Sequence, residues 1–160
     1  MRKLNLGCSD ALEPGYINVD RVYPDRTGDT WGTDAEFDQA DLSHAWPWAD
    51  SSVGHIRAHD IIEHLVNKIH TMNEAWRVLQ KGGTFEIAVP TTDGPGAWQD
   101  PTHVSFWNRN SFMYFESGNP HLVRFGRAYG IKCAFRILRE QLEQVFDGVT
   151  KLTITLAAVK

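Results

Sequence analysis

Apolar residues recur along this chain with two different periods, one typical of helices and one typical of strands. The clearest helical pattern begins at Ile62 and follows alternating steps of three and four residues. Its members are Ile62, Leu65, Ile69, Met72, Trp76 and Leu79. Asp60 precedes the stripe, where a negative charge favours the helix dipole, and Lys81-Gly82-Gly83 follows it. The pattern therefore predicts one helix from about Ile62 to Leu79.

Short apolar or alternating segments elsewhere predict strands and turns. The expected strands are residues 3–6, Tyr16–Asp20, Phe37–Asp41, Val53–Ala58, Thr84–Val89, Ala134–Gln144 and Thr150–Val159. The segment 134–144 is also compatible with a helix. Polar loops are expected over 21–36 and 91–110, and a short helix near 110–115. Too few residues join the first two strands for a full crossover helix. The order of elements predicts an α/β fold, with a mostly parallel sheet and a C-terminal antiparallel hairpin.

Composition limits the class of protein. The 160 residues, 42% apolar and 22% charged, predict a single globular domain spanning 1–160. A net charge of −4 disfavours nucleic acid as a partner, and no apolar run is long enough for a membrane span. The N-terminus lacks a secretory signal, and Cys8 and Cys133 make no disulfide framework. These features predict a cytoplasmic protein.

Small and acidic residues follow the predicted strands at positions where ligands bind in open α/β sheets. Gly7 ends the first strand, Asp20 the second and Asp41 the third, so all three are expected at the carboxyl edge of the sheet. An adenosine-containing cofactor needs a tight turn and an acid for its ribose. We expect Asp20 to hold the ribose, and Asp41 with Leu42 to contact the adenine. The alternatives are a plain turn at Gly7 and capping roles for both acids.

These segments resemble the class I S-adenosylmethionine-dependent methyltransferases, particularly short domains of the type 11 kind. The matching segments are Leu4-Asn5-Leu6-Gly7-Cys8, Pro14–Asp20, Ala40-Asp41-Leu42, Trp46–Val53, Ile62-Glu63-His64-Leu65 and Glu74–Gly83. The resemblance implies a Rossmann-like fold that binds S-adenosylmethionine and releases S-adenosylhomocysteine. It also implies cofactor contacts from Asn5, Gly7 and Cys8, and we expect His59 to reach the same edge.

The chain departs from the family pattern in three places. Ser9 stands where many members have a second glycine, and Gly54 replaces a frequent aspartate of the fourth strand. The shortened connection between the first two strands predicts a more open site for the methionine end of the cofactor.

An aromatic segment after the fifth predicted strand is expected to cover the site. It runs from Trp98 to Trp107 and is followed by Phe112, Tyr114 and Phe115. Aromatic faces stabilise a cationic sulfonium, and a base assists a neutral acceptor. His103 is our candidate base and Asp100 its orienting or substrate-contacting partner. The alternatives are that His103 satisfies loop backbone groups and that the aromatics fill the core.

A metal site is not expected from the sequence. His59, Glu63 and His64 match neither His-Glu-x-x-His nor His-x-x-Glu-His, so one helical face does not offer two histidines and a base. Hydrogen bonds from Glu63 and His64 that anchor the helix near the sheet are the favoured interpretation.

The predicted function is methyl transfer to an oxygen or nitrogen. The Asn/Asp-Pro-Pro-Tyr motif and a basic stripe are both absent, which favours a small-molecule acceptor gripped by loops 21–36 and 91–120. Two alternatives stay open: a non-catalytic binding module that works with a partner subunit, and an enzyme that degrades S-adenosylmethionine. The sequence leaves the oligomeric state open.

Overall fold

The computed structural model describes residues 1–22, 35–146 and 148–160. Most of the loop predicted over 21–36, and Asp147 of the predicted hairpin turn, lie outside the described residues. Among the residues that are described, no helix is both long and apolar enough to cross a membrane.

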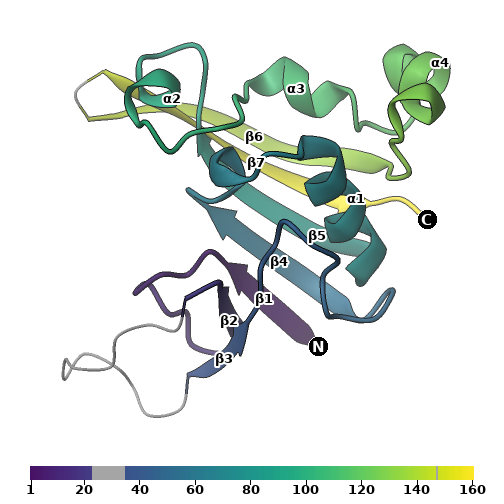
Figure 1. The fold of residues 1–160 in the computed structure, drawn as a ribbon. Helices are drawn as coiled ribbons and strands as arrows, with labels where there is room; N and C mark the ends of the chain where they lie inside the picture. Colours follow the sequence, from purple (N-terminus) through teal and green to yellow (C-terminus); the bar gives the residue numbers. More distant parts are fainter. Residues whose placement is uncertain (23–34, 147) are drawn as a thin grey trace.

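A seven-stranded mixed sheet forms the centre of the molecule (Figure 1). Its strands are β1 (Arg2–Leu6), β2 (Ile17–Asp20), β3 (Glu36–Gln39), β4 (Val53–His59), β5 (Leu79–Pro90), β6 (Phe135–Phe146) and β7 (Val149–Ala158), in the order β3-β2-β1-β4-β5-β7-β6. The first five strands run parallel, whereas β7 is antiparallel to both β5 and β6. The predicted fold, a mostly parallel sheet with a terminal hairpin, is confirmed. The C-terminal segments form strands, not the alternative helix.

The predicted helix over 62–79 is wrong in its continuity. The structure has a short 3-10 helix, η1 (Ile62–His64), followed by α1 (Lys68–Val78). Leu65 between them is extended, and the Asn67 side chain caps α1 by accepting a hydrogen bond from the His70 amide. Leu79 already belongs to β5, where it pairs with Val53. The periodicity was misleading because Ile62 and Leu65 are buried without belonging to the same helix as Met72.

Three further helices follow β5. They are α2 (Gly96–Gln99), α3 (Arg109–Met113) and α4 (Pro120–Tyr129). The short helix near 110–115 is confirmed by α3, but α4 was not predicted. Its signals were Asn119 as the capping residue, Pro120 in the first turn and Gly130 at the end. Of its ten residues only Gly126 is buried.

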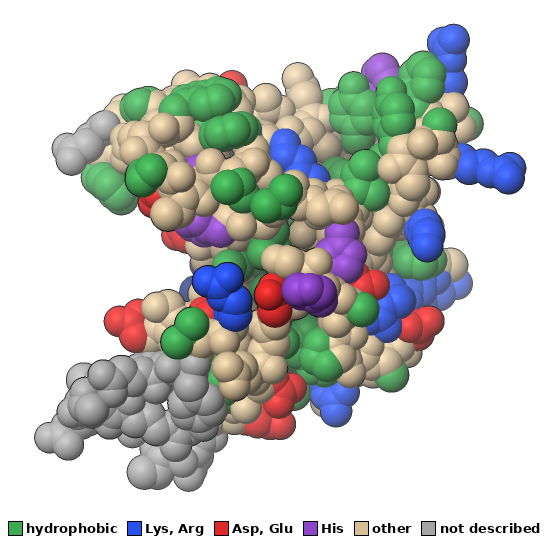
Figure 2. All heavy atoms as spheres, viewed as in Figure 1, with side chains coloured by type: hydrophobic (Ala, Val, Ile, Leu, Met, Phe, Trp, Pro, Cys, Tyr) green, Lys and Arg blue, Asp and Glu red, His purple; other side chains and the backbone are tan. Residues whose placement is uncertain are grey.

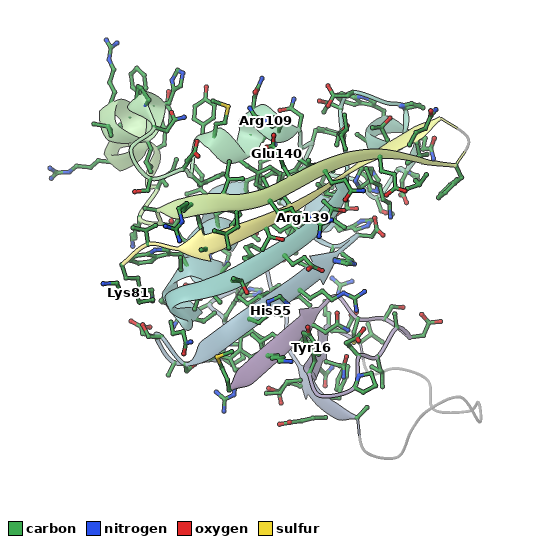
Figure 3. The ribbon with its side chains drawn as sticks, turned by 180° about the vertical axis from the view of Figure 1, so that it is seen from behind. Tyr16, His55, Lys81, Arg109, Arg139 and Glu140 are labelled. Carbon is green, nitrogen blue, oxygen red and sulfur yellow. The ribbon has the colours of Figure 1, made fainter. Side chains whose placement is uncertain are left out.

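The two faces of the sheet differ. Helix α1 packs against one face, and residues such as Met72, Ile56 and Phe85 form a single buried core there. Within the described part of the chain, no helix crosses the other face, which Figure 3 shows from the front. We call it the open face, and it carries Tyr16, His55 and Arg139, which are labelled in Figure 3. By strand alternation and register, the same face also carries Arg57, His59, Thr84, Glu86, Thr153 and Thr155.

Candidate functional site

A pocket lies at the carboxyl edge of β1, β2 and β3, where the sequence predicted a ligand site. Its volume is about 180 Å³, and we call it the rim pocket. It is lined by Gly7, Asp20, Arg21, Ala40, Asp41, Leu42, Ser43, Ile61, His64 and Leu65. Figure 2 shows the molecule hollowed between the segment around α2 and the strands β2 and β3, with histidine side chains on the inner wall.

Gly7 provides the turn at the base of the pocket. Its φ of +64° lies in the left-handed region that favours glycine. A Cβ atom at this position would lie 2.5 Å from Cγ1 of Ile61, so the side chain of Ile61 packs directly on the turn. Ser9, where the family has a second glycine, also has a positive φ, of +45°. The turn therefore requires left-handed backbone at both positions although only one is glycine.

Asp20 ends β2 with its carboxylate at the pocket. One oxygen, Oδ2, accepts a hydrogen bond from the Ser9 amide at 2.9 Å. The other, Oδ1, accepts from the amides of Arg21 at 2.7 Å and Val22 at 3.3 Å. An ionised carboxylate has about four acceptor positions, so Oδ2 can still accept a hydrogen bond. Asp20 thus holds the turn and can contact a ligand hydroxyl.

Asp41 and Leu42 form the adenine side of the predicted site. Oδ1 of Asp41 accepts a hydrogen bond from the Ser43 amide at 2.9 Å, and this bond lowers the pKa of the exposed Asp41 carboxyl. Leu42 is buried, and its carbonyl accepts a hydrogen bond from the Trp46 indole. Asp41 lies just beyond β3, so the third strand is shorter than predicted.

Asn5 and Cys8 are close in sequence to the pocket but do not line it. The amide of Asn5 donates to the Ala11 carbonyl and to Oδ1 of Asn18, both at 2.9 Å, and so fixes the short connection between β1 and β2. Cys8 is buried, and this burial, with nearby Asp20, raises the pKa of its thiol to about 11. Both side chains support the turn from inside the protein.

His59 lies away from the pocket, on the open face. Successive residues of a strand face opposite sides of a sheet, so Ile56 and Ala58 enter the core whereas Arg57 and His59 do not. Nε2 of His59 lies 2.9 Å from Oε1 of Glu86, and Nδ1 lies 3.3 Å from Nη2 of Arg57. The structure does not bring His59 together with the other predicted cofactor residues.

His103 joins the site through a contact that its sequence position does not suggest. The amides of Val104 and Ser105 both donate to the Glu63 carbonyl at 2.9 Å, and so dock the loop after α2 onto η1. Donor atoms of Glu63, His64 and His103 then lie within 4.8 Å of one another. We call these three residues the histidine–carboxylate cluster. His64 also lines the rim pocket, so the cluster and the pocket are adjacent.

The surroundings of His103 differ from those predicted. Nδ1 of His103 lies 3.1 Å from the Ala97 carbonyl, whereas Nε2 is 3.9 Å from Oδ2 of Asp100. Asp100 instead accepts hydrogen bonds from the amide and hydroxyl of Thr102, which lower the pKa of its carboxyl. The orientation of the His103 ring thus depends more on the Ala97 carbonyl than on Asp100.

Glu63 is the buried acid of the cluster. Only 2% of its surface is exposed, and within the described part of the chain neither carboxylate oxygen has a hydrogen-bond partner. This burial raises the pKa of Glu63 to about 7. A carboxyl with this pKa exchanges protons near neutral pH, as a general base must. The sequence prediction gave Glu63 only an anchoring role.

The predicted aromatic segment has two parts. Trp107, Phe112 and Phe115 are buried in the core. Trp98 is exposed and stacks on Phe106, with ring centroids 4.4 Å apart. The core interpretation therefore holds for the first group, and the second group remains at the surface.

Pocket residues that the sequence prediction missed come mainly from the segment after β4. Ile61 and Leu65 line the pocket, whereas the predicted helix began after Ile61 and included Leu65. Asp60 has a φ of +52°, and this left-handed residue turns the chain at the end of β4. The apolar pattern around Ile62 was visible, but the turn that directs Ile61 over Gly7 was not.

Comparisons with known proteins agree with this architecture. The family model described as a methyltransferase domain, of type 11, matches residues 18–87. No curated protein matches the sequence significantly.

Several solved structures share the fold. One is a putative methyltransferase from Bacillus halodurans, with TM-score 0.66 and 12% identity over 99% of this chain and 93% of that one. A second is the complex of the Haloferax volcanii Trm112 methyltransferase activator with the putative methyltransferase (TM-score 0.65, 15% identity, 99% and 83% coverage). A third is the 1,6-didemethyltoxoflavin-N1-methyltransferase of Burkholderia thailandensis, with its substrate and S-adenosylhomocysteine bound (TM-score 0.65, 16% identity, 99% and 71% coverage).

Proposed function

Because this chain carries a class I methyltransferase domain, we propose that it transfers the methyl group of S-adenosylmethionine to an oxygen or nitrogen of a small-molecule acceptor. The observation that supports this most strongly is the rim pocket, which joins Gly7, Asp20, Asp41 and Leu42 from three separate strand ends. When bound, the cofactor supplies an electrophilic methyl group on a sulfonium.

The residues of the pocket fit an adenosyl group. Oδ2 of Asp20 can accept a hydrogen bond from a ribose hydroxyl. Leu42, Ile61 and Leu65 provide apolar walls for the adenine, with Asp41 beside them. Gly7 at the left-handed turn has no Cβ, so a ligand can approach the backbone at the base of the pocket. Asn5 and Cys8 would act by holding this turn.

The acceptor would approach from the side of the histidine–carboxylate cluster. His64 belongs to both the cluster and the pocket, so groups that bind the acceptor and take its proton are adjacent to the cofactor. His103 and Glu63 are the groups that would handle this proton, and the loop 91–120 would contact the rest of the acceptor. Holding acceptor and methyl group in line would then supply much of the rate acceleration.

A second candidate is a domain that needs a partner subunit for activity. The open face favours it, because parallel sheets are usually covered by helices on both faces. One similar structure is itself a complex with a methyltransferase activator. In this case the isolated chain would bind the cofactor without methylating an acceptor.

Calorimetric titration with S-adenosylmethionine and S-adenosylhomocysteine tests the proposal. We expect micromolar binding by the wild type and at least a tenfold loss in Asp20→Ala, because a charged hydrogen bond contributes about 1.5–3 kcal/mol. Asp10→Ala is the matched control, since Asp10 is an exposed acid of the same loop that does not line the pocket.

Thermal unfolding of each variant would confirm that it is folded. Absence of binding by the wild type, or equal binding by Asp20→Ala, would contradict the cofactor assignment. If binding is established, an acceptor screen that measures release of S-adenosylhomocysteine separates the two candidates. Release by the chain alone supports the first candidate, and release only after a cell extract is added supports the need for a partner.

A further inference from the structure

We propose that Glu63, His64 and His103 form a binding site for one divalent transition-metal ion. Glu63 and His64 both lie in η1, which follows β4, whereas His103 lies in the loop after α2. Their donor atoms nevertheless lie within 4.8 Å of one another. Two imidazoles and one carboxylate are a common ligand set for zinc and for non-haem iron.

The environment of Glu63 is the first observation that supports a cation. The side chain is 98% buried, and among the described residues neither of its oxygens has a hydrogen-bond partner. An unpaired carboxylate in such a place costs several kcal/mol, so buried charges in proteins are usually paired or coordinate metals. A cation between Glu63 and the two imidazoles would compensate for this burial.

The hydrogen bonds of the two histidines are the second observation. Nδ1 of His64 lies 3.2 Å from the Thr102 carbonyl, and Nδ1 of His103 lies 3.1 Å from the Ala97 carbonyl. Metal-binding histidines generally donate one ring N–H to a carbonyl or carboxylate, which fixes the tautomer and leaves the other nitrogen for the metal. With Nδ1–H donated in both residues, both Nε2 atoms carry the free lone pair.

A network of hydrogen bonds supports this arrangement from behind. The Thr102 hydroxyl donates to Oδ1 of Asp100 at 2.6 Å, and the oxygen Oγ1 of this hydroxyl lies 3.1 Å from Nδ1 of His64. Donor atoms around a metal at about 2.1 Å are separated by roughly 3–3.5 Å. Small side-chain rotations of His64 and His103 would therefore complete the set without movement of the backbone.

The ligand types select among metals. Mg²⁺ and Ca²⁺ prefer sets made only of oxygen ligands, whereas Zn²⁺ and Fe²⁺ accept imidazole nitrogen together with a carboxylate. Three protein ligands leave coordination positions open. Because His64 also lines the rim pocket, an open position would adjoin the cofactor.

For the acceptor, the inference rests on the proposed function. A hydroxyl oxygen bound to the metal would have a lowered pKa and would be presented beside the cofactor. The site therefore points to hydroxyl-bearing acceptors rather than amines.

The test uses the full chain, stripped with a chelator and titrated with Zn²⁺ by calorimetry and with Co²⁺ by visible absorption. We expect one ion per chain. His64→Ala, His103→Ala and Glu63→Gln should each weaken binding by at least tenfold and reduce the cobalt absorption. His121→Ala is the control, because His121 is exposed in α4 and remote in sequence from the cluster.

Several results would overturn the proposal: no saturable binding by the wild type, wild-type affinity in the cluster variants, or a loss of affinity in His121→Ala equal to theirs. Because Glu63 is buried, the two histidine variants keep the test valid if Glu63→Gln does not fold. Titration of the stripped protein with S-adenosylhomocysteine separates the two hypotheses. Cofactor binding without any metal site would refute only this inference, whereas a metal site without cofactor binding would refute only the proposed function.

Discussion

At Gly7, backbone conformation and packing impose separate requirements on one residue. The positive φ favours glycine, and Ile61 occupies the space that a Cβ would need. Gly15, in the same connection between β1 and β2, also has a positive φ, of +78°, but nothing lies within 4 Å of its missing Cβ. The pair therefore allows the two requirements to be measured separately.

Gly15→Ala is expected to destabilise the protein by about 1 kcal/mol, the cost of left-handed backbone for alanine. Gly7→Ala adds a steric clash, so we expect about 3 kcal/mol and loss of cofactor binding. Urea unfolding of the two variants beside the wild type checks this difference. Equal losses of stability would mean that Ile61 yields freely and that only φ matters.

Glu63 should make the stability of the metal-free protein depend on pH. Its pKa is about 7 in the folded protein against 4.5 for an ordinary glutamate, so between these values the folded state holds a proton that the unfolded state has lost. Stability from this group is present below pH 4.5 and is lost as the pH rises to 7. The loss is about 3 kcal/mol, at 1.36 kcal/mol per pKa unit.

Glu63→Gln removes this charge and keeps the shape of the side chain. In the presence of a chelator, the variant should be more stable than the wild type at pH 8 and similar to it at pH 4. Urea unfolding across this pH range is the measurement. If the difference in stability between the wild type and Glu63→Gln stays constant with pH, Glu63 does not titrate in this range.

Local pattern was sufficient for some site residues and insufficient for others. Gly7, Asp20 and Asp41 lie at or just after the ends of strands, and parallel strands bring their carboxyl ends together, so the rim pocket was predictable. The contact of His103 with Glu63 depends on backbone hydrogen bonds between segments about 40 residues apart, which no local pattern encodes. His59 was misplaced because reaching the end of a strand does not specify which face a side chain takes.

At the scale of elements, hydrogen bonds of Arg77, together with those of Glu74 and His70, join α1 to the loop before β4. The guanidinium of Arg77 donates to the carbonyls of Trp46 and Trp48 and to the carboxylates of Asp50 and Glu74, at 2.7–2.9 Å. The chain before β4 is therefore held against α1 by a planar group with several donors.

Arg77→Ala should destabilise the protein by about 3 kcal/mol, because charge-assisted hydrogen bonds are lost and Glu74 loses its positively charged partner. Arg77→Lys should recover only part of this, since one ammonium cannot reproduce the fork of donors. Arg127→Ala, at an exposed position of α4, is the control and should change little. Thermal or urea unfolding checks the series, and full recovery by lysine would contradict the role of the fork.

Among the elements, helix limits were harder to predict than strands. The strands carry alternating or continuous apolar residues whose burial matches their period, as in β5 and β7. The break between η1 and α1 depends on the cap at Asn67, whereas apolar side chains are buried on both sides of the break, Ile62 before it and Met72 after it. The apolar stripe indicates which residues are buried, and because η1 and α1 both contain buried residues, it does not show where one helix ends and the next begins.

At the scale of the whole molecule, the strand order follows from connections that the sequence made visible. Parallel strands joined through η1 and α1, and a final pair in a hairpin, leave few arrangements for the sheet. The open face was less predictable. Its half-buried polar residues alternate with core residues, a pattern equally expected for a sheet covered by a partner.

The order of strands also determines which strands lie at the two edges of the sheet. The two outermost strands are β3, with four residues, and β6, with twelve. A long outer strand invites pairing with another molecule, and such pairing leads to aggregation. Strand β6 carries Arg136, Arg139, Glu140 and Glu143, and its pairing with β7 has two register shifts. Charge and irregular pairing at this border would keep copies of the protein from joining into a continuous fibre.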